Sequence, residues 1–484
     1  MIRSGVSLLA LALLAGCATA GPDYAPPADS AATTPAANGP FVSGQGPQFS
    51  QAELPDRWWK LYDDPQLDGL VEQALEANAN IRAADANLRK ADAVLRETAG
   101  QKTLATTIGA DADLERDYST ASAGTNLPGV LTYDLGLTLS YPLDLNGKIK
   151  RAIESSLADR EAVEAARDAV RISVAAATTK AYADVCAANY QIATVQKVIT
   201  LQQQTLNATG RLQRGGRGTA FDVSRARTAV ESSKANLPSF YAKRQSSLYL
   251  LATLLGKAPA EYPREVESCA NLPRLSQPMP VGDGAALIRR RPDIRQAERT
   301  IAGDTARIGV ATADLYPTVS IGGGIINDGK LENFGKTHSF GFSLGPLLSW
   351  SFPNRPIIRA RIEAANAQVE ADIARFDQTV LEALRGTETA LESYARDTDR
   401  AAALGRASDS AGLSAQQAGK LFRFGRSDFL NLLSAQGALA TAQVNHAAAE
   451  TALVDDQIAV FLALGGGWQR TEVQTGQPAG QQAR

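Results

Sequence analysis

The chain repeats itself, and this duplication limits its possible folds more than any other feature of the sequence. The stretch "NIRAADANLRKADAVL" at residues 80–95 matches "DIRQAERTIAGDTARI" at residues 293–308, an offset of 213 positions. Three more matches follow in the same order at offsets of 208 to 209: "NGKIKRAIE" with "NRPIIRARIE", "LQRGGRGTAFDV" with "LFRFGRSDFLNL", and Leu255-Gly256 with Leu464-Gly465. Four matches in one order indicate two copies of a single structural unit.

Each copy reads as a helix, two strands joined by a loop, and a long helical hairpin. Within "YDLGLTLSYPLD" at residues 133–144, every second side chain is apolar, and those between are mostly small, polar or acidic. Residues 106–115, 319–325 and 340–352 show the same alternation. A half-buried strand of a soluble protein would also alternate. Here the apolar set is unusually aliphatic and aromatic, which favours strands that face lipid.

Four strands are too few to close a sheet inside a membrane. Every unpaired backbone group at a sheet edge costs several kcal/mol in hydrocarbon, and the smallest common closed barrels have about eight strands. Either the four strands lie in water, or several chains contribute their strands to one shared barrel.

The rest of each copy is predicted to be helical. No Gly or Pro interrupts residues 148–209, which predicts a helix of roughly 90 Å at about 1.5 Å per residue. The return helix at residues 219–255 should break at Pro238. The second copy repeats the pair at residues 357–419 and 427–464. Ala-rich helix seams also fit an ordinary coiled-coil scaffold, and periodicity alone does not separate the two.

The N-terminus predicts the compartment. Arg3 precedes an apolar run that ends in Leu14-Ala15-Gly16-Cys17, and this run is too short for a membrane-spanning helix. The tetrad resembles a bacterial lipobox, which predicts cleavage after Gly16 and lipidation of Cys17. An ordinary secretory signal with an incidental cysteine is the alternative. The predicted divisions are a lipoprotein signal peptide at 1–16, an extended, lipidated tether at 17–55, the first repeat at 56–259, a Pro-rich connector at 260–282, the second repeat at 283–467 and a flexible tail at 468–484.

Composition and motifs argue against an enzyme. The 49 basic and 51 acidic residues nearly cancel, which gives no sign of nucleic-acid binding, and two His leave little material for zinc or His-based catalysis. No G-x-x-x-x-G-K-[ST] phosphate loop is present. We therefore expect no enzyme activity and no cofactor besides the covalent lipid on Cys17. An oxidising envelope would allow a disulfide between Cys186 and Cys269, with two free thiols as the alternative.

Four stretches, together with the lipobox, carry a family resemblance. They are "WWKLYDDPQLDGLVEQALEAN" at 58–78, "YPLDLNGKIKRA" at 141–152, "RRRPDIRQAE" at 289–298 and "ALGGGW" at 463–468. Together they resemble the lipoprotein branch of the TolC-like outer membrane factors, the NodT-type channels of tripartite efflux systems. The resemblance covers roughly residues 55–468.

The resemblance implies a fold, partners and a location. The fold is mainly α with a membrane β part, in which a homotrimer forms one twelve-stranded transmembrane β-barrel and a long periplasmic α-helical barrel. The expected function is a passive exit duct in the outer membrane of a Gram-negative bacterium, lipid-anchored and extending into the periplasm. A periplasmic adaptor (a membrane fusion protein) and an inner-membrane transporter of the resistance-nodulation-division type deliver the substrates.

The two predicted hairpin turns share an Arg-x-Gly-Arg pattern, and the resemblance places both the gate and the adaptor contact there. The expected adaptor contacts are Gly216, Arg217, Gly218, Thr219, Ala220 and Phe221 at the first tip, and Gly425, Arg426, Ser427, Asp428 and Phe429 at the second. Members of the family often carry aspartates after the second tip, where this chain has Asn431 and Ser434.

The gate is therefore expected to close without a strongly acidic ring. The candidate latch consists of polar hydrogen bonds, or of pairing between Arg426 and Asp428 or Asp222. The alternative is a set of solvated hairpin charges, each pair worth about 0 to 1 kcal/mol.

Two further readings stay open. Asp111, Asp113 and Glu115 would gather nine carboxylates in a trimer and favour cations at a pore mouth, or they simply form a solvated strand face. The alternative function is a periplasmic coiled-coil lipoprotein scaffold without a pore, which would leave four apolar strand faces in water. The cargo could be drugs, metal ions or signal molecules.

Overall fold

The computed structural model describes residues 19–115, 129–352 and 354–466, and the chain divides into two compact units. Cys17, the loop residues 116–128 and the tail at 468–484, for which the sequence makes predictions, lie outside the described residues. The first unit contains the described chain up to Ala28, Asn87–Glu164 and Gln296–Phe376; the second contains Asp29–Ala86, Ala165–Arg295 and the described chain from Asp377. Each unit therefore draws on both sequence copies.

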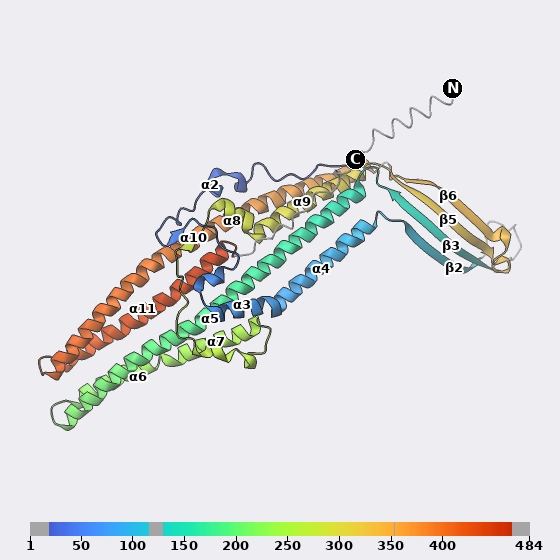
Figure 1. The fold of residues 1–484 in the computed structure, drawn as a ribbon. Helices are drawn as coiled ribbons and strands as arrows, with labels where there is room; N and C mark the ends of the chain where they lie inside the picture. Colours follow the sequence, from blue (N-terminus) through green and yellow to red (C-terminus); the bar gives the residue numbers. More distant parts are fainter. Residues whose placement is uncertain (1–18, 116–128, 353, 467–484) are drawn as a thin grey trace, which may run out of the picture. The chain divides into compact units, whose positions relative to one another are not determined.

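A four-stranded antiparallel sheet is the main element of the first unit, with the strand order β2-β3-β5-β6 (Figure 1). Its strands are β2 (Ala105–Glu115), β3 (Val130–Leu143), β5 (Thr318–Lys330) and β6 (Phe340–Ser349). The four predicted strands are confirmed, although β5 continues to Lys330 and β6 ends before Trp350 and Phe352. Two short turns, η5 (Leu331–Asn333) and η6 (Thr337–Ser339), connect β5 to β6.

Four helices join the sheet at one end. α4 (Ala79–Gly100) precedes β2, α5 (Lys148–Arg214) follows β3, α9 (Pro292–Ala313) precedes β5 and α10 (Arg355–Arg423) follows β6. The register places Ala105 opposite Ser140 and Thr318 opposite Ser349, so the strand ends that lead to helices lie together. The predicted order of helix, two strands and helix is confirmed for each copy.

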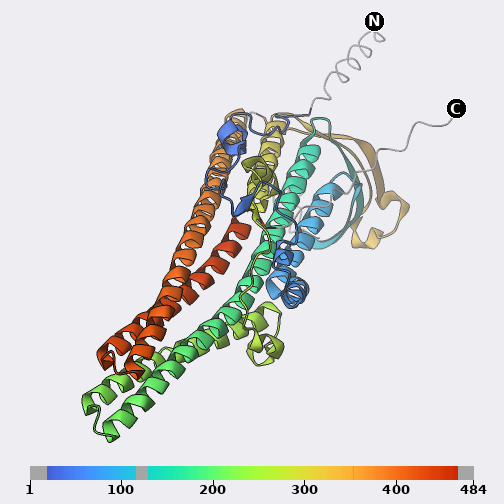
Figure 2. The ribbon, with the colours of Figure 1, turned by 60° about the vertical axis from the view of Figure 1, so that its left-hand side comes forward.

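Two helical hairpins provide most of the second unit, and Figures 1 and 2 show the two helices of each running side by side. α5, with 67 residues, returns as α6 (Ala220–Lys234) and α7 (Leu237–Leu254), while α10, with 69 residues, returns as α11 (Phe429–Ala463). The predicted break is confirmed, since Pro238 is the second residue of α7, where its missing N–H interrupts no helical hydrogen bond. The second copy has Ala447 at the matching position, and α11 is continuous.

An aromatic turn at the start of the first copy packs against the last helix of the second. The turn η2 (Trp58–Tyr62) leads into α3 (Pro65–Ala77), and the Trp58 side chain is fully buried. Its ring stacks on that of Phe461 in α11, with ring centroids 4.6 Å apart. Tyr62 meets the Phe461 ring edge-on at 6.3 Å. This cluster joins the two copies within the second unit.

The segment before the first copy differs from the extended tether that the sequence predicts. It contains η1 (Ala31–Thr33), α2 (Pro35–Asn38) and β1 (Phe49–Ser50), which pairs in parallel with β4 (Met279–Pro280). Phe41, Phe49 and Leu54 are buried, and the N–H groups of Val42 and Ser43 donate to Glu388. The Pro- and Ala-rich composition suggested a free chain, whereas the three buried apolar side chains and the backbone hydrogen bonds hold it in place.

A disulfide fixes the connector to α5. Cys186 and Cys269 are bonded with Cα atoms 4.9 Å apart, and the Asn189 side chain donates to the carbonyls of Glu267 at 2.9 Å and Cys269 at 2.6 Å. The connector contains the turns η3 (Pro259–Glu261) and η4 (Arg264–Ser268) and leads to α8 (Gly284–Arg290). Covalent and polar contacts thus hold the same short stretch.

Candidate functional site in the sheet and the hairpin tips

The two faces of the four-stranded sheet differ in chemistry. The register aligns Ile108, Leu137, Ile325 and Phe342 across all four strands on one face. On the opposite face, the next row contains Thr107, Thr138, Gly324 and Ser343. The apolar face is open in a single chain, where Phe342 is 90% exposed and Leu344 is 82% exposed. A large exposed apolar surface marks contact with lipid or with another protein.

Aromatic side chains lie at both ends of this apolar face. Near the helices, the rings of Trp350 and Phe352 are 5.3 Å apart, and Tyr141 lies near the same end of β3. At the other end, the Tyr133 ring contacts the Phe334 ring at 4.9 Å. Tyr141 lies eight positions after Tyr133, which corresponds to about 26 Å of strand, or about 20 Å across a membrane if the strand is tilted. This spacing is close to the apolar band of roughly 25 Å in membrane barrels.

A row of aspartates crosses the polar face near the Tyr133 end. The register pairs Asp111 with Asp134, and Asp134 with Asp328. All three side chains are exposed. The sequence predicts an acidic group of Asp111, Asp113 and Glu115, without Asp134 and Asp328. Alternation along one strand shows which side chains share a face of the sheet. Which residues of neighbouring strands lie beside them depends on the register, which the alternation does not give.

Both hairpin tips are closed by the same backbone geometry. At the first tip, Gly216 has φ of 72°, and the N–H groups of Gly216 and Arg217 donate to the carbonyls of Gln213 and Leu212 at 3.0 and 2.8 Å. At the second, Gly425 has φ of 69°, and the N–H groups of Gly425 and Arg426 donate to Phe422 and Leu421 at 3.1 and 2.9 Å. This paired bonding ends a helix where a glycine accepts the left-handed conformation. The repeated Gly-Arg of the sequence is therefore a helix stop.

The tip carboxylates cap helices. Asp222 accepts hydrogen bonds from the N–H group and the hydroxyl of Thr219 at 3.2 and 2.7 Å, and Asp428 accepts from the N–H group of Asn431 at 2.8 Å. Within the described part of one chain, no ion pair joins Arg426 to either carboxylate. The latch predicted between Arg426 and Asp222 or Asp428 is thus absent from the described part of a single chain. Each carboxylate instead accepts from a backbone N–H group at the start of its own helix. Asn431 and Ser434 are exposed.

The tip side chains are mostly accessible, with one correction. Phe221 is 65% exposed and lies under the Arg225 guanidinium at 5.4 Å. Phe429, predicted as an adaptor contact, is buried, and its ring lies 6.2 Å from that of Phe422. Phe424, which is not among the predicted contacts, is 79% exposed. Phe424 follows the last residue of α10 and directly precedes Gly425, whose backbone is left-handed. A side chain at such a helix end does not pack against the partner helix, and this sequence position could have indicated that Phe424 is exposed.

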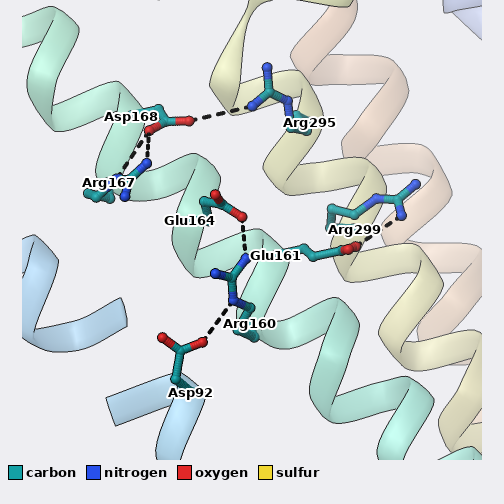
Figure 3. A network of polar contacts seen from close by, with 8 residues as sticks. All are labelled: Asp92, Arg160, Glu161, Glu164, Arg167, Asp168, Arg295 and Arg299. Carbon is teal, nitrogen blue, oxygen red and sulfur yellow. Dashed lines mark hydrogen bonds and ion pairs between the residues drawn. The ribbon is translucent and has the colours of Figure 1, made fainter. Parts of the chain in front are cut away.

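Ion pairs hold α5 against its neighbours, as Figure 3 shows. In the first unit, Arg160 of α5 donates to Asp92 of α4 at 2.9 Å, and Arg299 of α9 donates to Glu161 of α5 at 3.2 Å. In the second unit, the buried Asp168 accepts from Arg167 at 2.7 Å and from Arg295 at 3.5 Å. The pairs made by Arg160, Arg299 and Arg295 link α5 to α4 and α9, whereas the Arg167–Asp168 pair lies within α5. The charged face of α5 therefore serves to hold helices together.

A pair of aspartates links α10 to α11 in the second unit. Burial raises the pKa of Asp456 to about 6, and a hydrogen bond with Asp397 adds to the effect. A nearby carboxyl group disfavours the charged form of Asp456 in this way. No sequence pattern indicates this pair, because the two residues are 59 positions apart.

In the three described ranges, no helix is both long enough and apolar enough to cross a membrane. The same ranges contain no group of three or more His, Cys, Asp or Glu residues placed to hold a metal ion.

Comparisons with known proteins converge on one family. Residues 70–257 and 285–466 match the family described as outer membrane efflux protein. Nodulation protein T of Rhizobium leguminosarum bv. trifolii is 29% identical over 465 residues, which cover 94% of this chain and 96% of that protein. The pyoverdine export outer membrane protein OpmQ of Pseudomonas putida is 28% identical over 442 residues, covering 89% and 92%. The solved structure of the outer-membrane channel OprN has a TM-score of 0.84 and 34% identity, covering 93% of this chain and 99% of that one.

Proposed function

The chain belongs to the outer membrane efflux protein family and is an outer membrane efflux channel, and from this premise we propose that it works as a trimeric, passive exit duct. The observation that carries the proposal is the open four-stranded sheet. Within the described residues of one chain, β2 and β6 each have one unpaired edge, and such edges must be paired in hydrocarbon. If β6 of each chain pairs with β2 of the next, three chains close a barrel of twelve strands.

We propose that the duct works as the outer part of a tripartite system. An inner-membrane transporter of the resistance-nodulation-division type would supply the energy, and a periplasmic adaptor would bind the hairpin tips. The exposed residues of the tips, including Arg217, Phe221, Phe424 and Arg426, offer that contact. Asn431 and Ser434 would face their copies across the closed aperture. In addition, Cys17 would carry a lipid that anchors the chain. One relative is named for nodulation and another for pyoverdine export, so the cargo is best identified by measurement.

Deleting the gene tests the duct directly. We expect at least a fourfold loss of tolerance to one or more antibiotics, dyes or metal salts, restored by the wild-type gene. The double variant Phe221→Ala/Phe424→Ala should fail to restore tolerance, because both side chains are exposed at the tips. Val42→Ala, an exposed apolar residue in the segment that precedes the first repeat, is the matched control. Unchanged tolerance to every compound after deletion would contradict an efflux role.

We also propose that the aspartate row favours cations at the outer mouth. Asp111, Asp134 and Asp328 would bring nine carboxylates together in a trimer. Replacing all three with Asn should lower the preference for K⁺ over Cl⁻ at least threefold, measured as the reversal potential of the channel in planar bilayers under a KCl gradient. Ser343→Asn, on the same face, changes no charge and should leave that potential unaltered. An identical reversal potential in the triple variant and the wild type would refute the proposal.

A further inference from the structure

The chain close to its N-terminus lies in a groove of the first unit. The N–H group of Ala20 donates to the carbonyl of Asn146 at 3.0 Å. Arg151, in the first turn of α5, donates through Nε to the carbonyl of Ala20 at 3.0 Å and through Nη2 to that of Gly21 at 3.2 Å. The Arg151 side chain is only 4% exposed. A buried guanidinium thus binds the main chain of two successive residues.

Glycines make this close approach possible. A Cβ atom at Gly309 of α9 would lie 2.7 Å from the Ala20 carbonyl oxygen and 2.7 Å from Cγ of Arg151. Gly21 has φ of 75°, and a Cβ there would lie 2.4 Å from Cα of Gly309. All three distances are shorter than those that real Cβ atoms show, so the segment fits only because neither Gly21 nor Gly309 has a side chain.

Side chains of the segment complete the contact. Asp23 accepts from Nη2 of Arg151 at 2.7 Å, while Glu154 of α5 accepts from Nη1 at 2.8 Å. The Tyr24 hydroxyl donates to Glu298 of α9 at 2.9 Å, and the Arg299 guanidinium lies 5.5 Å from the centre of the Tyr24 ring. The segment is therefore held by α5 and α9 together, with the buried charge of Arg151 paired.

The sequence duplication provides an internal comparison. Arg359 of α10 matches Arg151 at the offset of 208, yet it is exposed, and within the described ranges no hydrogen bond or ion pair of its side chain is found. At the offset of 213, one position beyond the matched stretch, Gly309 corresponds to Arg96. The features that accept the segment are thus present in only one of the two copies, which argues for a specific role rather than a by-product of the repeated fold.

We propose that Arg151, Asn146 and Gly309 form a seat for the mature N-terminus, and that Arg151 is a positioning residue for the lipid anchor. The inference rests on the proposed lipidation of Cys17. Thr19 is two residues after Cys17, a distance of at most about 7 Å along the chain. Four residues separate the end of β3 at Leu143 from the start of α5 at Lys148. The seat therefore makes the acyl chains enter the membrane beside the base of the sheet.

Hydrogen–deuterium exchange followed by mass spectrometry, on the full-length trimer in detergent, tests the seat. In Arg151→Ala and in Gly309→Ala, the backbone N–H group of Ala20, which donates to Asn146 in the wild type, should exchange at least tenfold faster than in the wild type. The matched controls are Arg359→Ala and Gly386→Ala, a helical glycine with open space around it; both should keep the wild-type rate. Arg151→Lys keeps the positive charge but loses the several N–H donors of the planar guanidinium, so its exchange rate should lie between those of the wild type and Arg151→Ala.

The outcomes separate the seat from the channel. The amount of heat-sensitive trimer on a gel shows that each variant has assembled, and Gly309→Ala and Arg151→Lys remain informative if Arg151→Ala does not. Wild-type exchange rates in assembled Gly309→Ala and in either Arg151 variant would overturn the seat. The mass of the N-terminal peptide should include a lipid. A peptide without lipid would overturn the anchoring role, whereas the efflux function is judged independently by the tolerance of the deletion strain.

Discussion

Replacing Phe342 with arginine is expected to prevent assembly of the trimer in the membrane. Phe342 is 90% exposed and shares its row with Leu137, which lies midway between Tyr133 and Tyr141. An arginine on the lipid face costs about 2 to 4 kcal/mol at the bilayer midplane, or about 6 to 12 kcal/mol for three chains. That sum is comparable to the whole stability of many folded domains.

The next residue provides the control. Ser343 lies on the opposite face of the same strand, so Ser343→Arg should project into water and leave assembly close to the wild-type level. The measurement is the fraction of membrane-extracted protein that migrates as a trimer without heating. Equal assembly of the two arginine variants would mean that the apolar face does not meet lipid, as a coiled-coil scaffold with strands in water would require.

The elements of the fold could be predicted because their signals are local. The period of two in β3 and β5, the uninterrupted helices and the break at Pro238 each follow from neighbouring residues along the chain. The duplication then fixed their order, since one copy predicts the other. The packing of the chain before residue 55 was missed because Phe41 and Phe49 are isolated apolar residues without any period.

The candidate sites were predicted less completely, because their geometry depends on partners distant in sequence. Asp328 joins Asp134 only through the pairing of β3 with β5, 194 positions apart. The predicted pairing of Arg426 with Asp428 is not found within the described part of a single chain, for a local reason: Asp428 is the N-cap of α11 and accepts a hydrogen bond from a backbone N–H group. The lengths of helices and strands and their apolar faces can be derived from residue types. Which donor a carboxylate accepts from, however, must be seen in the structure.

Trp58→Ala is expected to lower the free energy of unfolding by about 3 to 5 kcal/mol, the range for removing a large buried aromatic side chain. The Trp58 side chain is fully buried and stacks on Phe461, and its indole N–H group has no hydrogen-bond partner among the described residues. The loss should therefore come from packing alone. Because Trp58 belongs to the first copy and Phe461 to the second, the cavity would open at the contact that joins the copies in the second unit.

The midpoint of guanidinium unfolding, followed by circular dichroism at equal protomer concentration, measures this loss. Trp58→Phe retains an aromatic ring against Phe461 and should lose less than half as much stability. The control Phe424→Ala removes an aromatic side chain that is 79% exposed and should change the free energy of unfolding by less than about 0.5 kcal/mol. A loss below about 1 kcal/mol in Trp58→Ala would mean that the aromatic cluster does not hold the copies together, and that the disulfide between Cys186 and Cys269 and the β1–β4 pairing carry more of the stability of the second unit.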